Sequence, residues 1–139
     1  MSTLYLKGLE QALTGNIDCE NDTIKLRYMS TSYTPDVTTE NFWSDISASE
    51  ASGAPTETLA NVDVRIDTAN ARVEVDADDV SETGVTTTTN KVVIYKDTGV
   101  DSTSPLIAAI DIAEGTLSPV AGTLSLAFNS EGILAINAT

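Results

Sequence analysis

Strict alternation of apolar and polar residues restricts three segments of this chain to β-structure. They are DTIKLRYM at residues 22–29, NVDVRID at 61–67 and ARVEVD at 71–76. Successive side chains of a strand point to opposite faces of a sheet, so each segment predicts one face in a core and the other in water. Residues 67–70 between the last two segments are turn formers, which predicts that these two strands form a hairpin.

The second half of the chain predicts four more strands. KVVIYK at residues 91–96 and PLIAAIDI at 105–112 are denser in apolar residues, as inner strands of a sheet are, and the second should return beside the first. TLSLAF and ILAI close the chain, and the NSEG between them predicts another hairpin. Short strands with frequent turns predict one mainly-β domain over residues 1–139, built as a β-sandwich or a small barrel.

Residues 4–14 are the segment with the clearest helical pattern. Tyr5, Leu9 and Leu13 fall on one apolar stripe, and Gly15 supplies a stop signal. A short amphipathic helix needs something to cover such a stripe. We expect it to dock either on its own sheet or on a neighbouring subunit.

Residues 31–57 lack any periodicity and are rich in Ser, Thr, Ala, Pro and Glu. This composition predicts a long loop or arm, with one helical turn around TENFWSDI. Loops of this length in compact domains are usually functional. Phe42 and Trp43 are the most suggestive apolar pair in it, because loop aromatics are favoured anchors at protein interfaces. The alternative is that both fold back onto the core of their own domain.

The chain carries 21 acidic and 7 basic side chains, a net charge of −14. Such a surface repels nucleic-acid phosphates and anionic lipid headgroups, so we expect neither a nucleic acid nor a membrane as partner. There is no run of about 18 apolar residues and no signal-peptide pattern, which predicts a protein kept in the cytoplasm unless an assembly carries it out. With no histidine and only Cys19, Ser-His and Cys-His nucleophiles are excluded, as is an intrachain disulfide.

The segment YKDTGVDST, residues 95–103, contains the Asp-Thr-Gly motif of aspartic proteases and resembles the active-site loop of small dimeric retroviral proteases. Those enzymes pair two carboxylates that share a proton. Lys96 stands where they carry an apolar residue, and a lysine there favours ionisation of both carboxylates. We therefore predict that Asp97 opens a turn in which Gly99 takes a positive φ, and we assign no catalytic residue. A dimeric aspartic protease remains a remote alternative.

Two groups of acidic residues raise the question of a metal. Asp18, Glu20 and Asp22 alternate, and a second group lies at residues 76–79. Neither provides the Gly at position six and the Glu at position twelve of a calcium-binding EF-hand loop. We predict that both are solvated acidic surface, and we assign no metal ligand and no cofactor.

Three blocks of the sequence resemble, in the same order, a family of small virion proteins of tailed bacteriophages. KGLEQALTGNIDCENDTIKL is similar to the family's opening, a short helix ending in Gly followed by Ile-Asp and Asp-Thr-Ile-Lys. SYTPDVTTENFWSDI resembles its next segment, a Tyr-Thr turn leading to an aromatic and Ser-Asp-Ile. VVIYKDTGVDSTSPLIAAIDI is similar to its most recognisable block. The C-terminal SLAFNSEGILAI departs from the Trp-Asp type of ending of the family.

The resemblance implies a structural protein of the virion, of the head decoration or cement type. Such a protein would bind the outer surface of the assembled head and stabilise contacts between capsomers. Its partners would be the major capsid protein and, as a dimer or trimer, itself; its place would be the capsid exterior, after assembly in the host cytoplasm. The candidate contacts are Tyr5, Leu9, Leu13, Phe42 and Trp43. The alternative is a tail, neck or fibre component that binds a receptor or a partner ring.

Overall fold

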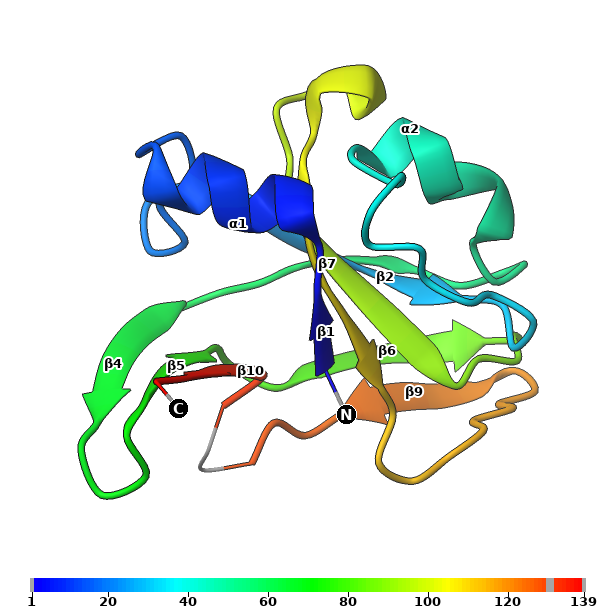
Figure 1. The fold of residues 1–139 in the computed structure, drawn as a ribbon. Coiled ribbons are helices and arrows are strands. Elements are labelled where there is room, and N and C mark those ends of the chain that lie inside the picture. Colours follow the sequence, from blue (N-terminus) through cyan, green and yellow to red (C-terminus); the bar gives the residue numbers. More distant parts are fainter. Residues whose placement is uncertain (1, 130–131, 139) are drawn as a thin grey trace.

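The computed structural model describes residues 2–129 and 132–138 of the chain. Most of the elements in these residues are strands (Figure 1). In chain order they are β1 (Ser2–Leu4), α1 (Leu6–Leu13), β2 (Ile24–Met29), α2 (Trp43–Ile46), the 3-10 helix η1 (Ser47–Ser49), β3 (Thr56–Thr58), β4 (Asp63–Asp67), β5 (Arg72–Asp76), β6 (Val80–Val85), β7 (Lys91–Lys96), the 3-10 helix η2 (Asp101–Thr103), β8 (Leu106–Asp111), β9 (Gly122–Leu126) and β10 (Leu134–Asn137).

The largest sheet contains five strands in the order β1-β8-β7-β2-β3, and every neighbouring pair is antiparallel. β7 lies in its middle, and the inner residues of this strand, Val92 to Tyr95, are all buried. A strand covered on both faces is apolar on both, which explains the density of KVVIYK. The prediction that PLIAAIDI returns beside it is confirmed, because β8 pairs with β7.

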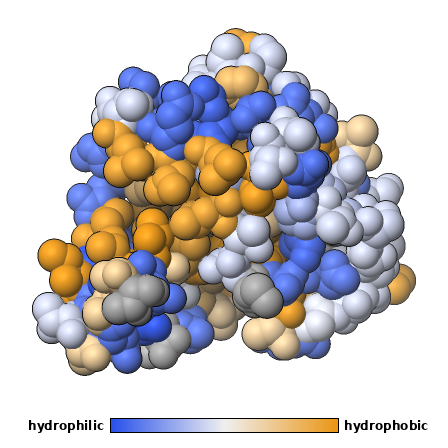
Figure 2. Space-filling view, viewed as in Figure 1, coloured by the Kyte–Doolittle hydropathy of each residue, from blue (hydrophilic) through white to orange (hydrophobic). Residues whose placement is uncertain are grey.

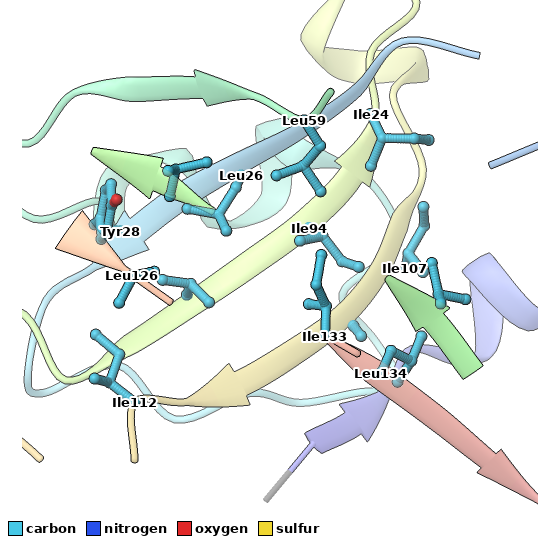
Figure 3. Packing of buried hydrophobic residues seen from close by; sticks show 14 of the residues in the cluster. Ile24, Leu26, Tyr28, Leu59, Ile94, Ile107, Ile112, Leu126, Ile133 and Leu134 are labelled. Carbon is cyan, nitrogen blue, oxygen red and sulfur yellow. The ribbon is translucent and has the colours of Figure 1, made fainter. Parts of the chain in front are cut away.

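Both faces of this central sheet are covered, which gives the molecule a layered structure (Figure 1). On one face, the sheets β10-β5-β4 and β6-β9 enclose a core that includes Leu26, Ile94 and Leu134 (Figure 3). On the other face, α1, α2 and the chain around them enclose a second core that includes Trp43 and Tyr95. The two cores are separated only by the thickness of the central sheet.

The predicted mainly-β fold with a short N-terminal helix is confirmed. The sheets of the described residues do not close into a barrel. The hairpin predicted at residues 67–70 is also confirmed, because β4 and β5 are antiparallel neighbours across that turn.

The predicted C-terminal hairpin is correct at its turn, where Asn129 and Gly132 form an antiparallel bridge, and wrong for the two strands. β9 pairs with β6, and β10 pairs with β5, so the last two strands belong to different sheets. The pairing of β10 places Leu134 opposite Val75, and both are buried in the core, 3% and 8% exposed. Burial of these side chains therefore favours the pairing of β10 with β5 over a pairing with β9. Residues 130 and 131 of that turn lie outside the described residues.

α1 begins at Leu6, two residues later than predicted, because residues 2–4 form the edge strand β1 beside β8. Tyr5 makes the corner, and its backbone N–H donates to the carbonyl of Ile107. Gly15, with φ of +80°, follows the end of the helix as the sequence indicates. No helix in the described part of the chain has both the length and the apolar character needed to cross a membrane.

Gly8 is the point at which α1 touches the central sheet. A Cβ atom built on it would lie 2.3 Å from the carbonyl oxygen of Leu106 and 2.8 Å from Cα of Ile107. A glycine inside a helix costs up to about 1 kcal/mol relative to alanine. Here glycine alone permits the backbones of α1 and β8 to approach this closely, which explains its place in a short helix.

Residues 31–57 pack on the central sheet along much of their length. Phe42 forms a bridge with Pro105, and Glu50 forms one with Met29. The predicted helical turn is α2, and Asp45 fixes its start, because its Oδ2 accepts the N–H of Phe42 at 2.9 Å. The last residues of the segment belong to β3. This segment therefore forms a covering layer of the fold.

Candidate interaction surface

Tyr5 and Trp43, two of the predicted contacts, belong to the second core and are 0% and 1% exposed. The hydroxyl of Tyr5 is hydrogen-bonded to the hydroxyl of Tyr33, and burial is the main cause that raises the pKa of Tyr5. These two side chains are not available to a partner in this fold. For Trp43, the alternative that it folds back onto its own domain is the one observed.

The indole of Trp43 is held between two side chains of the central sheet. It stacks on Tyr95, with ring centroids 5.2 Å apart and an interplanar angle of 9°. The guanidinium of Arg27 lies 4.8 Å from the ring of Trp43, and it pairs with Glu50 at 3.0 Å. Stacking and cation–π contacts of this kind fix the position of α2 on the sheet.

The other predicted contacts are accessible to different degrees. Leu13 is 79% exposed, whereas Leu9 and Phe42 are half-buried. The ammonium of Lys7 lies 5.7 Å from the ring of Phe42, so α1 and the start of α2 touch at the surface. Only Leu13 among the predicted contacts is a fully exposed apolar side chain.

A larger apolar surface lies over α1 and the sheet β10-β5-β4. Figure 2 shows hydrophobic side chains gathered below the helix and across this sheet. Most of the exposed large hydrophobic side chains of the described residues belong to these elements; they are Leu6, Leu13, Val64, Ile66, Val73 and Ile136, which we call the apolar face. Val100 and Val120 are exposed outside it.

The strand pairing explains how the sheet builds its share of the apolar face. Ile66, Val73 and Ile136 lie opposite one another and form one row across β4, β5 and β10. In this row Ile66 is 77% exposed. The neighbouring row contains Val75 and Leu134, which are buried, and Val64 on the edge strand β4, which is 40% exposed. The core therefore covers the neighbouring row on β5 and β10 and leaves Val64 and the row of Ile66 open.

The reverse face of the same hairpin carries a network of ion pairs. Arg65 pairs with Glu74 at 2.9 Å and with Asp76 at 3.2 Å, and Arg72 pairs with Glu74 at 2.7 Å and with Asp67 at 3.1 Å. Glu74 is only 4% exposed. Cross-strand pairs of opposite charge stabilise a sheet, so the hairpin keeps its shape while one of its faces stays apolar and open.

The alternation of β4 and β5 predicts a buried apolar face, and for the outer row that prediction is wrong. The pattern correctly places Val64, Ile66 and Val73 on one face of the sheet. It carries no information on how far the covering layer extends, which depends on where β10 and α1 lie. The sequence does offer one sign of this exposed row. Ile66 lies directly beside the turn, where side chains are usually exposed.

Asp97 lies in a turn, as predicted. Its Oδ1 accepts the N–H of Gly99 at 2.9 Å, and Gly99 has φ of +86°. Its Oδ2 pairs with the ammonium of Lys25 at 2.7 Å, and this bond is the main cause that lowers the pKa of Asp97. A carboxylate held ionised by a lysine is a poor member of a dyad that must share a proton.

The first acidic group singled out in the sequence, Asp18, Glu20 and Asp22, accepts hydrogen bonds from backbone N–H groups. Oδ1 of Asp18 accepts the N–H of Glu20 at 3.1 Å, and Oδ2 of Asp22 accepts the N–H of Asp18 at 2.8 Å. Oε1 of Glu20 accepts the N–H of Val64 on the edge strand β4 at 2.9 Å. In the residues that the structure describes, no group of three or more acidic or cysteine side chains is arranged to hold a metal ion.

Every lysine and arginine of the chain is paired with a carboxylate of the same chain. The pairs are Lys7–Glu10, Lys25–Asp97, Arg27–Glu50, Arg65–Glu74, Arg72–Glu74, Lys91–Asp111 and Lys96–Asp22. The charge that remains outside these pairs is carboxylate. The surface that this molecule offers to a partner therefore combines the apolar face with unpaired negative charge.

No protein-family model, no curated protein and no solved structure matches this chain.

Proposed function

We propose that this protein is a structural component of a tailed-phage virion, a decoration or cement protein that binds the assembled head through its apolar face. The observation that carries the proposal is that face itself. Contiguous exposed apolar surface on a soluble protein commonly marks an interaction site. The resemblance of the three ordered sequence blocks to phage virion proteins suggests the kind of partner, a phage head.

The protein's other features support binding rather than catalysis. Asp97 is engaged with Lys25, and the aromatic side chains of the second core are held in place by stacking. The apolar face is framed by two ordered elements, α1 and the sheet β10-β5-β4. A preorganised surface loses little conformational entropy on binding.

The charges favour a basic acceptor over a second copy of the chain. Two copies that meet at their apolar faces would each bring a net charge of −14 and no free lysine or arginine. An acceptor with basic residues around an apolar groove would gain electrostatic steering instead. We therefore place the major capsid protein on this face, and any dimer or trimer contact on another surface.

Binding to heads that lack the protein tests the proposal. The wild type should co-sediment with such heads and raise the temperature at which they release their DNA, since a ligand of the assembled state stabilises it. Ile66→Ser combined with Ile136→Ser should weaken binding at least tenfold, because two apolar contacts are lost. Val120→Ser, at a side chain 80% exposed outside the apolar face, is the matched control and should bind normally.

The possible outcomes test the decoration role and the assignment of the apolar face separately. A wild type that binds no head, or heads whose heat resistance is unchanged, would reject the decoration role. Binding that survives the double substitution would keep the role and reject the apolar face. Binding to isolated tails instead of heads would favour the tail, neck or fibre alternative. An oligomer that the double substitution converts to monomer would assign the face to a second copy.

A further inference from the structure

Two buried side-chain oxygens without a hydrogen-bond partner lie on neighbouring strands of the central sheet. They are the hydroxyl of Tyr28 on β2 and Oε1 of Glu57 on β3. A third, Oδ1 of Asn90, lies one residue before β7, the strand on the other side of β2. Buried polar groups are nearly always hydrogen-bonded, so each of these oxygens calls for an explanation.

The strand register places Tyr28 and Glu57 on the same face. Glu57 lies opposite Leu26, and Leu26 and Tyr28 both point into the core shared with the smaller sheets. Tyr28 lies at one end of that core, far from Ile107 and Leu134 (Figure 3). Its side chain and its hydroxyl are buried, and it belongs to the same core cluster as Val80 on β6 and Leu124 on β9.

A second carboxylate reaches this region from the opposing layer. Glu82 on β6 lies opposite Leu124, a core residue that is 1% exposed, so its side chain leaves the strand on the core-facing side. Glu82 itself is exposed, which places it at the rim. Burial and then the Glu82 carboxylate raise the pKa of Glu57, and burial followed by Glu57 and Glu82 raises that of Tyr28.

No lysine or arginine is paired with these two carboxylates in the residues that the structure describes. All seven lysine and arginine side chains pair with other acids, and none of the ion pairs found in the described residues involves Glu57 or Glu82. Two like charges and an orphaned hydroxyl at the edge of a core are unfavourable without a counter-charge. A cation with a preference for oxygen would relieve both costs.

We propose that Tyr28, Glu57 and Glu82 form a binding site for a hard divalent cation, with Ca²⁺ as the ion that suits it best. Ca²⁺ accepts carboxylate, neutral oxygen and water ligands in irregular geometry, whereas Mg²⁺ demands a near-ideal octahedron. The exposed Glu82 gives the ion its entry path, and water completes the coordination. With two carboxylates, the site belongs to the weak class, with a Kd of roughly 0.1–1 mM.

The site is distinct from the apolar face and from the proposed virion role. It would join β3 of the central sheet to β6 of the second layer, so a bound ion would link the two layers. We expect Ca²⁺ to stabilise the fold whether or not the protein binds a phage head.

Thermal unfolding of the purified chain tests the site. At ten times Kd, CaCl₂ should raise Tm by about 5 °C over NaCl of equal ionic strength. Glu82→Gln and Glu57→Gln should abolish the rise, and Tyr28→Phe should reduce it. Glu114→Gln makes the same charge change at an exposed residue elsewhere and should keep the full rise.

Terbium luminescence gives a second readout that stability alone would not change. Tb³⁺ substitutes for Ca²⁺ and emits when an excited tyrosine lies beside it. The wild type should sensitise Tb³⁺, Ca²⁺ should compete, and Tyr28→Phe should lose most of the emission. A wild-type Tm that is the same with CaCl₂ and NaCl would show that water alone fills the region and would overturn the proposal. An equal rise in the wild type and Glu82→Gln would overturn it as well.

Discussion

Gly8 sets the distance between α1 and the central sheet. Its Cα faces the backbone of Leu106 and Ile107, where no side chain can be accommodated. Sequence alone presents Gly8 as a weak point of a short helix. The structure shows that the same residue is what lets the helix dock, because the cost in helix propensity is offset by closer packing.

Substitution of this glycine should be far more harmful than helix propensity suggests. Gly8→Ala adds a methyl 2.3 Å from the oxygen of Leu106, so α1 must shift, and we expect a loss of about 1–3 kcal/mol in the free energy of unfolding. Urea denaturation followed by circular dichroism measures it. Gly15→Asn is the control: an added Cβ there meets nothing within 4 Å, and asparagine tolerates a positive φ. Stabilisation by Gly8→Ala would refute the close contact.

The ion pair of Asp97 should make stability depend on acidity. Lys25 lowers the folded pKa of Asp97, so its contribution is fully present above the unfolded pKa of about 3.9 and is lost as pH falls through the lower folded value. We expect Asp97→Asn to cost about 0.5–1 kcal/mol at pH 7, since the pair is partly exposed. Wild type and variant should converge near pH 2 in urea titrations. A difference that stays constant with pH would contradict this.

At the scale of elements, adjacent residues of one segment have opposite environments. Trp43 begins α2 and points into the second core, whereas Phe42, the residue before it, remains half-buried at the surface. Composition identifies both as candidate anchors and cannot separate them. The separation follows from the bridge between Phe42 and Pro105, which fixes which side chain faces the sheet.

Truncation of each aromatic side chain should show this difference. Trp43→Ala removes the stack on Tyr95 and should cost about 3–5 kcal/mol. Phe42→Ala removes a half-buried ring and its contact with Lys7 and should cost about 1 kcal/mol. Denaturant titration of both variants gives the comparison. Equal losses would mean that α2 is not anchored through Trp43.

Local pattern identifies the elements that bury one face or both. Alternation locates β2, β4 and β5, and apolar density locates β7 and β8. The sequence does not predict β1 and β3, because a strand of three residues is too short to show an alternating pattern. Their strand character comes from distant partners, such as the pairing of Ser2 with Ile110. Non-local pairing of the same kind explains why β10 pairs with β5 and not with β9, its neighbour in the sequence.

At the scale of the whole molecule, the excess of acid should make stability rise with salt. The acidic side chains outnumber the lysine and arginine side chains by fourteen. Each surface ion pair contributes little to stability, about 0–1 kcal/mol. Screening by salt therefore weakens the repulsion between carboxylates more than it weakens the attraction within ion pairs. We expect Tm to increase by several degrees between about 20 and 500 mM NaCl at pH 7. Calorimetry measures it, with KCl as a check on ion identity. A lower Tm at high salt would mean that the internal pairs dominate.

The candidate surface was only partly accessible to prediction. Leu13 is identified from the stripe of α1, but the row of Ile66, Val73 and Ile136 exists only after three strands from distant parts of the chain are assembled. The proposed cation site likewise combines residues of two layers. Sequence periodicity describes one element at a time, whereas these surfaces are properties of the assembled molecule.

The single tryptophan gives this architecture a built-in optical reporter. Trp43 lies entirely in the core beneath the helices, between Arg27 and Tyr95, so its emission senses that layer alone. Far-ultraviolet dichroism senses the strands on both sides of the central sheet. If the two signals change together on denaturation, the layers unfold as one cooperative unit. If the emission changes first, the helical layer detaches while the sheets remain folded. A partner would then be able to bind a partly opened molecule.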